Sequence, residues 1–112
     1  MVTYTIALVV GTHLPQAALV EFSGHDKPIH FLAYAVLGLL VLAYGAARWG
    51  MSRKSLCGIV IGLGVFAALD ELTQSYVPGR YPNIDDWYAD TTGVVSAVMV
   101  WCLVEIRAVG RR

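Results

Sequence analysis

Four apolar stretches, separated by short polar connections, organise the sequence. Three of them are long enough for a membrane-spanning helix, which needs about 20 mainly apolar residues. They cover about residues 28–47, 55–77 and 86–106. The first stretch, about residues 2–20, contains Thr12, His13, Pro15 and Gln16. It predicts either a kinked fourth span or a shorter helix that ends near Pro15 and continues as a re-entrant segment. The pattern predicts an all-α fold, a polytopic membrane bundle of four helices.

The composition indicates that the lipid bilayer is the solvent of this chain. Hydrophobic residues make up 57% of the 112 residues and charged residues 14%, far from the average of a soluble domain. We expect a single domain, residues 1–112. The formal net charge of zero gives no indication of a nucleic-acid partner. No Lys or Arg precedes Glu21, so a membrane-embedded helix fits the first stretch better than a cleaved signal peptide.

The basic residues predict the orientation of the bundle. If the spans alternate in direction, six of the eight Lys and Arg residues lie on one side: Arg48, Arg53, Lys54, Arg107, Arg111 and Arg112. The positive-inside rule makes this side, with the C-terminus, cytoplasmic. Lys27 and Arg80 fall in the opposite loops, about residues 21–28 and 77–86, which we therefore expect outside the membrane.

Small residues in two of the long stretches predict close contacts between helices. Gly58, Gly62 and Gly64 lie in the second of these stretches, and Gly93 and Ala97 lie in the third. In a bilayer such residues let helix backbones approach one another. We therefore expect both sets to pack against neighbouring helices.

Polar residues from three helices are predicted to meet near the outer membrane surface. At 1.5 Å per helical residue, Asp70 lies about 22 Å from the cytoplasmic end of a hydrocarbon core about 30 Å thick. Gln74 is one turn further out, and Tyr34 is one turn below His30. The predicted layer comprises Asp26, Lys27, His30, Asp70, Glu71, Gln74, Arg80, Asp86 and Asp90. A carboxylate below the interface is costly unless it is paired. We expect Asp70 to have a basic partner: Lys27, His30 or Arg80.

Four polar motifs follow one another along the chain: Asp26-Lys27-x-x-His30-Phe31-x-x-Tyr34-x-x-Leu37, Asp70-Glu71-x-x-Gln74, Pro78-Gly79-Arg80 and Asp86-x-x-x-Asp90-x-x-Gly93. In this order they resemble the VanZ-like family, small membrane proteins named after a teicoplanin-resistance protein. The resemblance covers most of residues 26–106. The family usually has Asn in place of Asp90 and Gly in place of Ala97, so this chain adds a carboxyl group at one position and keeps a small residue at the other.

The resemblance implies a helical protein of a bacterial-type cell membrane, with its polar site on the extracytoplasmic side. For the member that gave the family its name, it implies a link to resistance against glycopeptides that bind cell-wall precursors. It implies no particular reaction, and the enzymatic status of this chain stays open.

Several kinds of chemistry fit the predicted polar layer. Lys27, His30 and Arg80 could hold an anionic headgroup, with the carboxylates orienting donors or binding a divalent cation that bridges to phosphate. Asp70 or Glu71 could act with His30 as a general acid and base on a lipid-linked substrate. The same groups could carry protons or ions, although three or four spans form a poor pathway without an oligomer. The structural alternative is an ion-pair network that holds the helices together.

The interpretation that we favour is a binding function. We expect a polar pocket for a cell-envelope amphiphile, either a polyprenyl-phosphate-type lipid or precursor, or a lipidated glycopeptide. The expected ligand-binding residues are Asp26, Lys27, His30, Tyr34, Gln74, Arg80, Asp86 and Asp90. The first alternative is a membrane enzyme with Asp70, Glu71 and His30 as catalytic residues. The second is a structural or interaction subunit. A divalent cation, an oligomer and a partner membrane protein are compatible with each of these functions.

Overall fold

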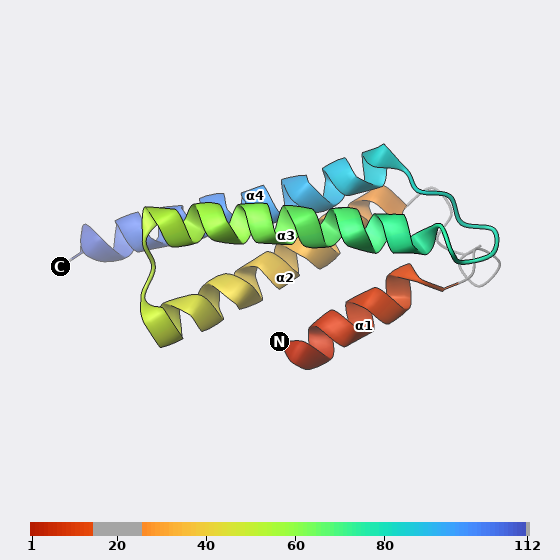
Figure 1. The fold of residues 1–112 in the computed structure, drawn as a ribbon. Coiled ribbons are helices and arrows are strands. Elements are labelled where there is room, and N and C mark those ends of the chain that lie inside the picture. The colour runs from red at the N-terminus through yellow and green to blue at the C-terminus, as the bar shows by residue number, and fades with distance from the viewer. Residues whose placement is uncertain (15–25, 112) are drawn as a thin grey trace.

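Four helices and no strands make up the described part of the chain. The structure, a computed structural model, describes residues 1–14 and 26–111, except for the side chain of Asp26. The helices are α1 (Val2–Thr12), α2 (Asp26–Trp49), α3 (Arg53–Gln74) and α4 (Ile84–Val109) (Figure 1). The three longer helices are apolar and long enough to cross a membrane. The predicted all-α bundle with three membrane-length helices is confirmed.

Local capping places the starts of α3 and α4 a few residues before the predicted boundaries. The Ser52 hydroxyl accepts a hydrogen bond from the backbone N–H of Ser55 at 3.1 Å. The Asn83 side chain accepts one from the backbone N–H of Asp85 at 3.0 Å, and α4 begins at Ile84. Such caps satisfy the free N–H groups of a polar first turn. Hydropathy alone does not include these polar turns, so it predicts helices that begin too late.

α1 is too short to cross a membrane. Its 11 residues extend about 16 Å, roughly half of a hydrocarbon core. The helix ends at Thr12, which agrees with the shorter of the two predicted forms, whereas residues 15–20 of the predicted stretch lie outside the described residues. Leu8 is buried in the core, and the Tyr4 hydroxyl donates a hydrogen bond to the carbonyl oxygen of Ala33 at 2.8 Å. These contacts attach α1 to the longer helices.

α2 and α4 run in the same direction and pack closely through small residues. A Cβ atom added at Gly93 would overlap the carbonyl oxygen of Phe31 and lie 3.0 Å from the backbone nitrogen of Ala35. About one turn further along both helices, a Cβ atom at Gly38 would lie 2.9 Å from that of Ala97. The contacts follow in the same order along both helices, so α2 and α4 are parallel. The predicted packing role of Gly93 and Ala97 is confirmed.

The glycines of α3 have no such role within the described chain. A Cβ atom added at Gly58, Gly62 or Gly64 would meet no other group within 4 Å. The prediction that these residues pack against a neighbouring helix of the same chain is therefore wrong. The reason is that the Cα–H side of each of these glycines faces away from α2 and α4. The contact of Gly64 with α4 is made by its backbone carbonyl oxygen, which accepts a hydrogen bond from Trp87 Nε1 at 3.0 Å.

The two ends of the bundle differ in charge. Figure 1 shows the α2–α3 connection and the C-terminal end of α4 at one end, with the α3–α4 connection and the start of α2 at the other. The first end carries the basic residues Arg48, Arg53, Lys54, Arg107 and Arg111. The second end carries most of the acidic residues. The spans therefore alternate in direction as predicted.

Candidate functional site

Six polar side chains are buried at the end of the bundle where α3 finishes and α2 and α4 begin. Each residue is at most 8% exposed: His30, Asp70, Glu71, Gln74, Asp86 and Asp90. Tyr34, one turn further along α2, is also fully buried. We call these seven residues the polar centre. It lies toward one end of the three apolar helices that are long enough to cross a membrane.

Asp70 connects three helices. Its Oδ1 accepts a hydrogen bond from the Thr12 hydroxyl of α1 at 3.0 Å, and its Oδ2 accepts one from the Tyr34 hydroxyl of α2 at 3.2 Å. The Gln74 Nε2 lies 3.5 Å from Oδ2, and the His13 Nδ1 lies 3.6 Å from Oδ1. Both oxygens are therefore satisfied, as expected of a buried carboxyl group.

The prediction that Lys27, His30 or Arg80 is the basic partner of Asp70 is wrong. Lys27 and His30 face α4, and the Arg80 guanidinium donates a hydrogen bond to the carbonyl oxygen of Leu14 at 2.9 Å. Depth in the membrane predicts which residues share a layer, but the rotation of each helix about its axis decides which of them meet. The surroundings of Asp70 are those of a residue that anchors α1 to the bundle.

We expect Tyr34→Phe to lower the free energy of unfolding in detergent by about 1–2 kcal/mol, because Asp70 Oδ2 then keeps only its long contact with Gln74. The matched control is Tyr44→Phe, since Tyr44 is 44% exposed at the other end of α2. Denaturation followed by circular dichroism measures both variants. An equal loss in the two variants would contradict the role given to the Tyr34 hydroxyl.

Two charged pairs connect α2 with α4. The His30 Nδ1 lies 2.9 Å from Asp90 Oδ1, and both side chains are buried. The Lys27 Nζ lies 3.8 Å from Asp86 Oδ1, with the Lys27 side chain 50% exposed. In each helix the two residues are about one turn apart. The pairs therefore form successive cross-links, and the outer one opens toward solvent.

Glu71 links α3 to the start of α4. Its Oε1 accepts a hydrogen bond from the backbone N–H of Asn83 at 2.5 Å. Glu71 also lies within electrostatic range of His30, Asp86 and Asp90. The side chain is thus fixed at one oxygen and belongs to the same group of charges as the two cross-links.

Three carboxylate oxygens of the polar centre have no hydrogen-bond partner within the described residues. They are Glu71 Oε2, Asp86 Oδ1 and Asp90 Oδ2, and all three are buried. A buried acceptor that lacks a partner costs about 1–3 kcal/mol. Such atoms are uncommon in folded proteins. Their concentration in one place indicates a position where a ligand, an ion or water would supply donors.

The structure brings together most of the predicted ligand-binding residues. His30, Tyr34, Gln74, Asp86 and Asp90 belong to the polar centre, and Lys27 lies at its edge. Arg80 lies apart from them, beside the residue that follows His13. Asp26 begins α2, but the position of its side chain falls outside the described part of the structure. The three predicted catalytic residues, Asp70, Glu71 and His30, all lie in the polar centre but contact different partners.

Thr12, His13 and Asn83 are not among the predicted site residues. His13 also places its Nε2 2.9 Å from the Thr73 hydroxyl, so α1 and α3 meet through two polar residues. The available signal was their position inside an apolar stretch, since polar groups at membrane depth need partners. For Asn83, the signal was a capping residue directly before a helix with an acidic first turn.

The described residues contain no group of three His, Cys, Asp or Glu side chains arranged to hold a metal ion. The carboxyl groups considered for a divalent cation have separate roles. Asp70 binds groups of α1 and α2, Glu71 binds the start of α4, and Asp90 pairs with His30. A divalent cation would require several of these side chains to move.

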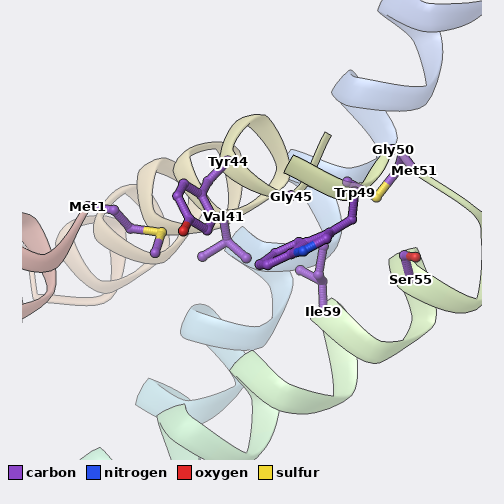
Figure 2. A pocket seen from close by; sticks show the side chains of 9 residues that line it. All are labelled: Met1, Val41, Tyr44, Gly45, Trp49, Gly50, Met51, Ser55 and Ile59. Atoms are coloured by element: carbon purple, nitrogen blue, oxygen red, sulfur yellow. The ribbon is translucent and has the colours of Figure 1, made fainter. Parts of the chain in front are cut away.

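An apolar groove lies at the opposite end of the bundle (Figure 2). It has a volume of about 300 Å³ and is lined by Met1, Val41, Tyr44, Gly45, Trp49, Gly50, Met51, Ser55 and Ile59. Figure 2 shows the side chains of Val41, Trp49 and Ile59 gathered between α2 and α3. Met1, which directly precedes the start of α1, lies at one edge of the groove. The lining has no acidic or basic side chain, so it suits hydrocarbon.

One comparison with known proteins identifies a family. A model of the family described as VanZ/LLP1 matches residues 2–105. No curated protein and no solved structure gives a significant match. The matched region begins with α1 and includes every residue of the polar centre. It thus extends beyond the four motifs to the first helix.

Proposed function

The chain belongs to the VanZ/LLP1 family, and from this premise we propose that it is a membrane protein that binds a cell-envelope amphiphile at the polar centre. The polar group of the amphiphile would lie beside Glu71, Asp86 and Asp90, at the ends of the apolar helices. Its hydrocarbon part would remain in the bilayer next to the bundle.

The observation that carries this proposal is the set of three buried carboxylate oxygens without hydrogen-bond partners in the described chain. Purely structural networks satisfy their buried groups, as Asp70 does with donors from three helices. The unsatisfied oxygens instead retain capacity for a further partner. Their location at headgroup depth makes an amphiphile the natural source of that partner.

The distribution of basic residues supports an extracytoplasmic position for the polar centre. Five basic residues in the described chain lie at the end opposite to it, and the positive-inside rule assigns such an end to the cytoplasm. A lipid or antibiotic that resides in the outer leaflet could then reach the centre without crossing the membrane.

Two ligand classes follow from the sequence. One is a polyprenyl-phosphate-type lipid or a lipid-linked cell-wall precursor. The other is a lipidated glycopeptide such as teicoplanin, to which the resemblance to the VanZ-like family points. Both combine a large polar group with a long hydrocarbon chain, as a site at the membrane surface requires.

If the protein is an enzyme, fewer residues are available for catalysis than the three that the sequence predicts. Asp70 is held by hydrogen bonds on both oxygens, so it is poorly placed to exchange a proton with a substrate. Glu71 keeps one oxygen without a hydrogen-bond partner in the described chain, and His30 contacts Asp90 through its Nδ1. Incubation of the purified protein with a polyprenyl phosphate, followed by product analysis, separates turnover from binding.

The binding experiment uses the full-length protein in nanodiscs and titrates a polyprenyl phosphate, teicoplanin and a glycopeptide that lacks the acyl chain. The neutral, isosteric double variant Glu71→Gln/Asp86→Asn is compared with Glu105→Gln, which removes an exposed carboxylate from the far end of α4. We expect at least one amphiphile to bind, and its affinity to change by about tenfold or more in the double variant. The Glu105 variant should stay within about twofold of the wild type.

Two results would contradict the proposal. The first is that none of the amphiphiles binds to the wild-type protein. The second is that the double variant and the Glu105 control bind alike, which would leave the polar centre as a structural network. Unfolding temperatures of all variants, measured in the same nanodiscs, confirm that the comparison is made between folded proteins.

A further inference from the structure

We propose that the polar centre recognises a primary ammonium group. The N–H groups of the ammonium would donate hydrogen bonds to Glu71 Oε2, Asp86 Oδ1 and Asp90 Oδ2. This inference rests on the proposed function and names the chemistry that the ligand must carry. It restricts the proposed ligand classes to amphiphiles whose polar group carries an ammonium, which excludes a polyprenyl phosphate without an amine, because the structure gathers carboxylates and not cations at this position.

The charges of the centre are strongly unequal. Four carboxyl groups are buried there, at 5% exposure for Asp70, 6% for Glu71, 8% for Asp86 and 1% for Asp90. Among the described residues that are equally buried, only His30 can carry a positive charge. Burial of unpaired negative charge is costly. A cation bound beside these groups would offset that cost.

An ammonium group fits the unsatisfied oxygens in number. It has three N–H donors and no acceptor, and three acceptor oxygens lack partners. Charge-assisted N–H···O contacts are about 2.7–2.9 Å long, whereas Mg²⁺ requires ligands at about 2.0–2.1 Å in octahedral geometry. The described residues include no group of three His, Cys, Asp or Glu side chains that could hold a metal ion, so an ammonium group, with its longer contacts, is the better match.

A protonated carboxyl gains an O–H donor that itself needs an acceptor. Protonation therefore satisfies one of the three oxygens only where another of them accepts the new donor. A ligand that carries donors satisfies the oxygens directly.

Lys27 shows that an ammonium group can approach the centre from solvent. Its Nζ lies 3.8 Å from Asp86 Oδ1, which is outside hydrogen-bond distance, and its side chain is half exposed. The Lys27 ammonium therefore competes with a bound amine for the same carboxylate. Removal of Lys27 should strengthen the binding of an amine, whereas it would weaken the binding of a phosphate.

The test titrates the full-length protein in detergent with dodecylamine, N-dodecylacetamide and dodecyl phosphate, using the fluorescence of its three tryptophans. We expect dodecylamine to bind about tenfold or more tightly than the other two. Asp86→Asn should weaken amine binding by about tenfold, and Lys27→Met should strengthen it several-fold. Lys54→Met, a matched change at the opposite end of the bundle, should leave it unaltered.

Other outcomes are informative in distinct ways. Preferential binding of dodecyl phosphate, weakened in Lys27→Met, would overturn the ammonium inference while leaving amphiphile binding intact. Equal binding of the amine and the amide would overturn it as well, as would binding of Mg²⁺ alone without any binding of amine. Ethylamine that binds as tightly as dodecylamine would support the ammonium site but contradict an amphiphilic ligand.

Discussion

Replacement of His30 by Leu is expected to lower the free energy of unfolding in detergent by about 3 kcal/mol or more. The His30 Nδ1 is the described partner of Asp90 Oδ1 at 2.9 Å, and Asp90 is only 1% exposed. The other oxygen, Oδ2, already lacks a partner among the described residues. Without His30 the whole carboxyl group is buried between α2 and α4 with no donor. Leu retains most of the side-chain volume, so the loss reports the polar partner and not a cavity.

Two companion variants give this prediction its control. Asp90→Asn keeps an oxygen that can accept from His30, so we expect a change within about 1 kcal/mol. The double variant His30→Leu/Asp90→Leu removes both polar partners, and we expect it to recover most of the lost stability. If His30→Leu and Asp90→Asn cost the same small amount, the pair does not hold α2 and α4 together.

Gly93→Ala is the second change with a large expected effect. The added Cβ atom would overlap the carbonyl oxygen of Phe31 and approach the nitrogen of Ala35. These are backbone atoms inside a helix, so they cannot move aside as the end of a side chain can. Separation of α2 from α4 is then required, and we expect a loss of about 3 kcal/mol, at the upper end of the usual cost of overpacking.

Gly62→Ala is the matched control, because a Cβ atom at Gly62 would meet nothing within 4 Å. Alanine also has the higher helix propensity. The control should therefore be as stable as the wild type or slightly more stable. Thermal unfolding in detergent measures both variants, and equal stability of the two would disprove the close parallel packing of α2 and α4.

Much of the fold could be predicted because membrane spans depend on length and hydrophobicity alone. The three long apolar stretches correspond to α2, α3 and α4, and α1 ends at Thr12, in agreement with the shorter of the two forms predicted for the first stretch. The contrast between Gly93 and Gly62 could not be predicted in this way. Both glycines lie in apolar helices, and only the packing of the whole bundle determines which one faces a neighbour.

For the candidate site, too, one part could be predicted from the sequence and another could not. Depth along each helix correctly predicted that His30, Asp70, Glu71, Asp86 and Asp90 share one layer. It did not predict their pairing, because pairing depends on the rotation of each helix about its own axis. Asp70 therefore bonds with α1 and Tyr34, and Arg80 contacts Leu14.

The pairing changes the chemistry expected of the site. With Arg80 elsewhere and Lys27 at the edge, the interior of the polar centre is acidic. The sequence favours a site whose basic residues bind phosphate. The structure instead shows an acidic site with carboxylate oxygens that lack hydrogen-bond donors. Asp90 contributes to this difference, since the resemblance to the VanZ-like family implies a neutral Asn at its position.

Photo-crosslinking locates the polar group of a bound amphiphile. The probes are an alkyl amine and an alkyl phosphate, each with a diazirine beside the headgroup, added to the full-length protein in nanodiscs. Mass spectrometry then maps the labelled residues. We expect labels from the amine to be concentrated in residues 26–34 and 83–93, around the polar centre, and to be lost in Glu71→Gln/Asp86→Asn. Labels spread evenly along the apolar helices, or confined to residues 49–55 and 105–111 at the opposite end, would contradict this expectation.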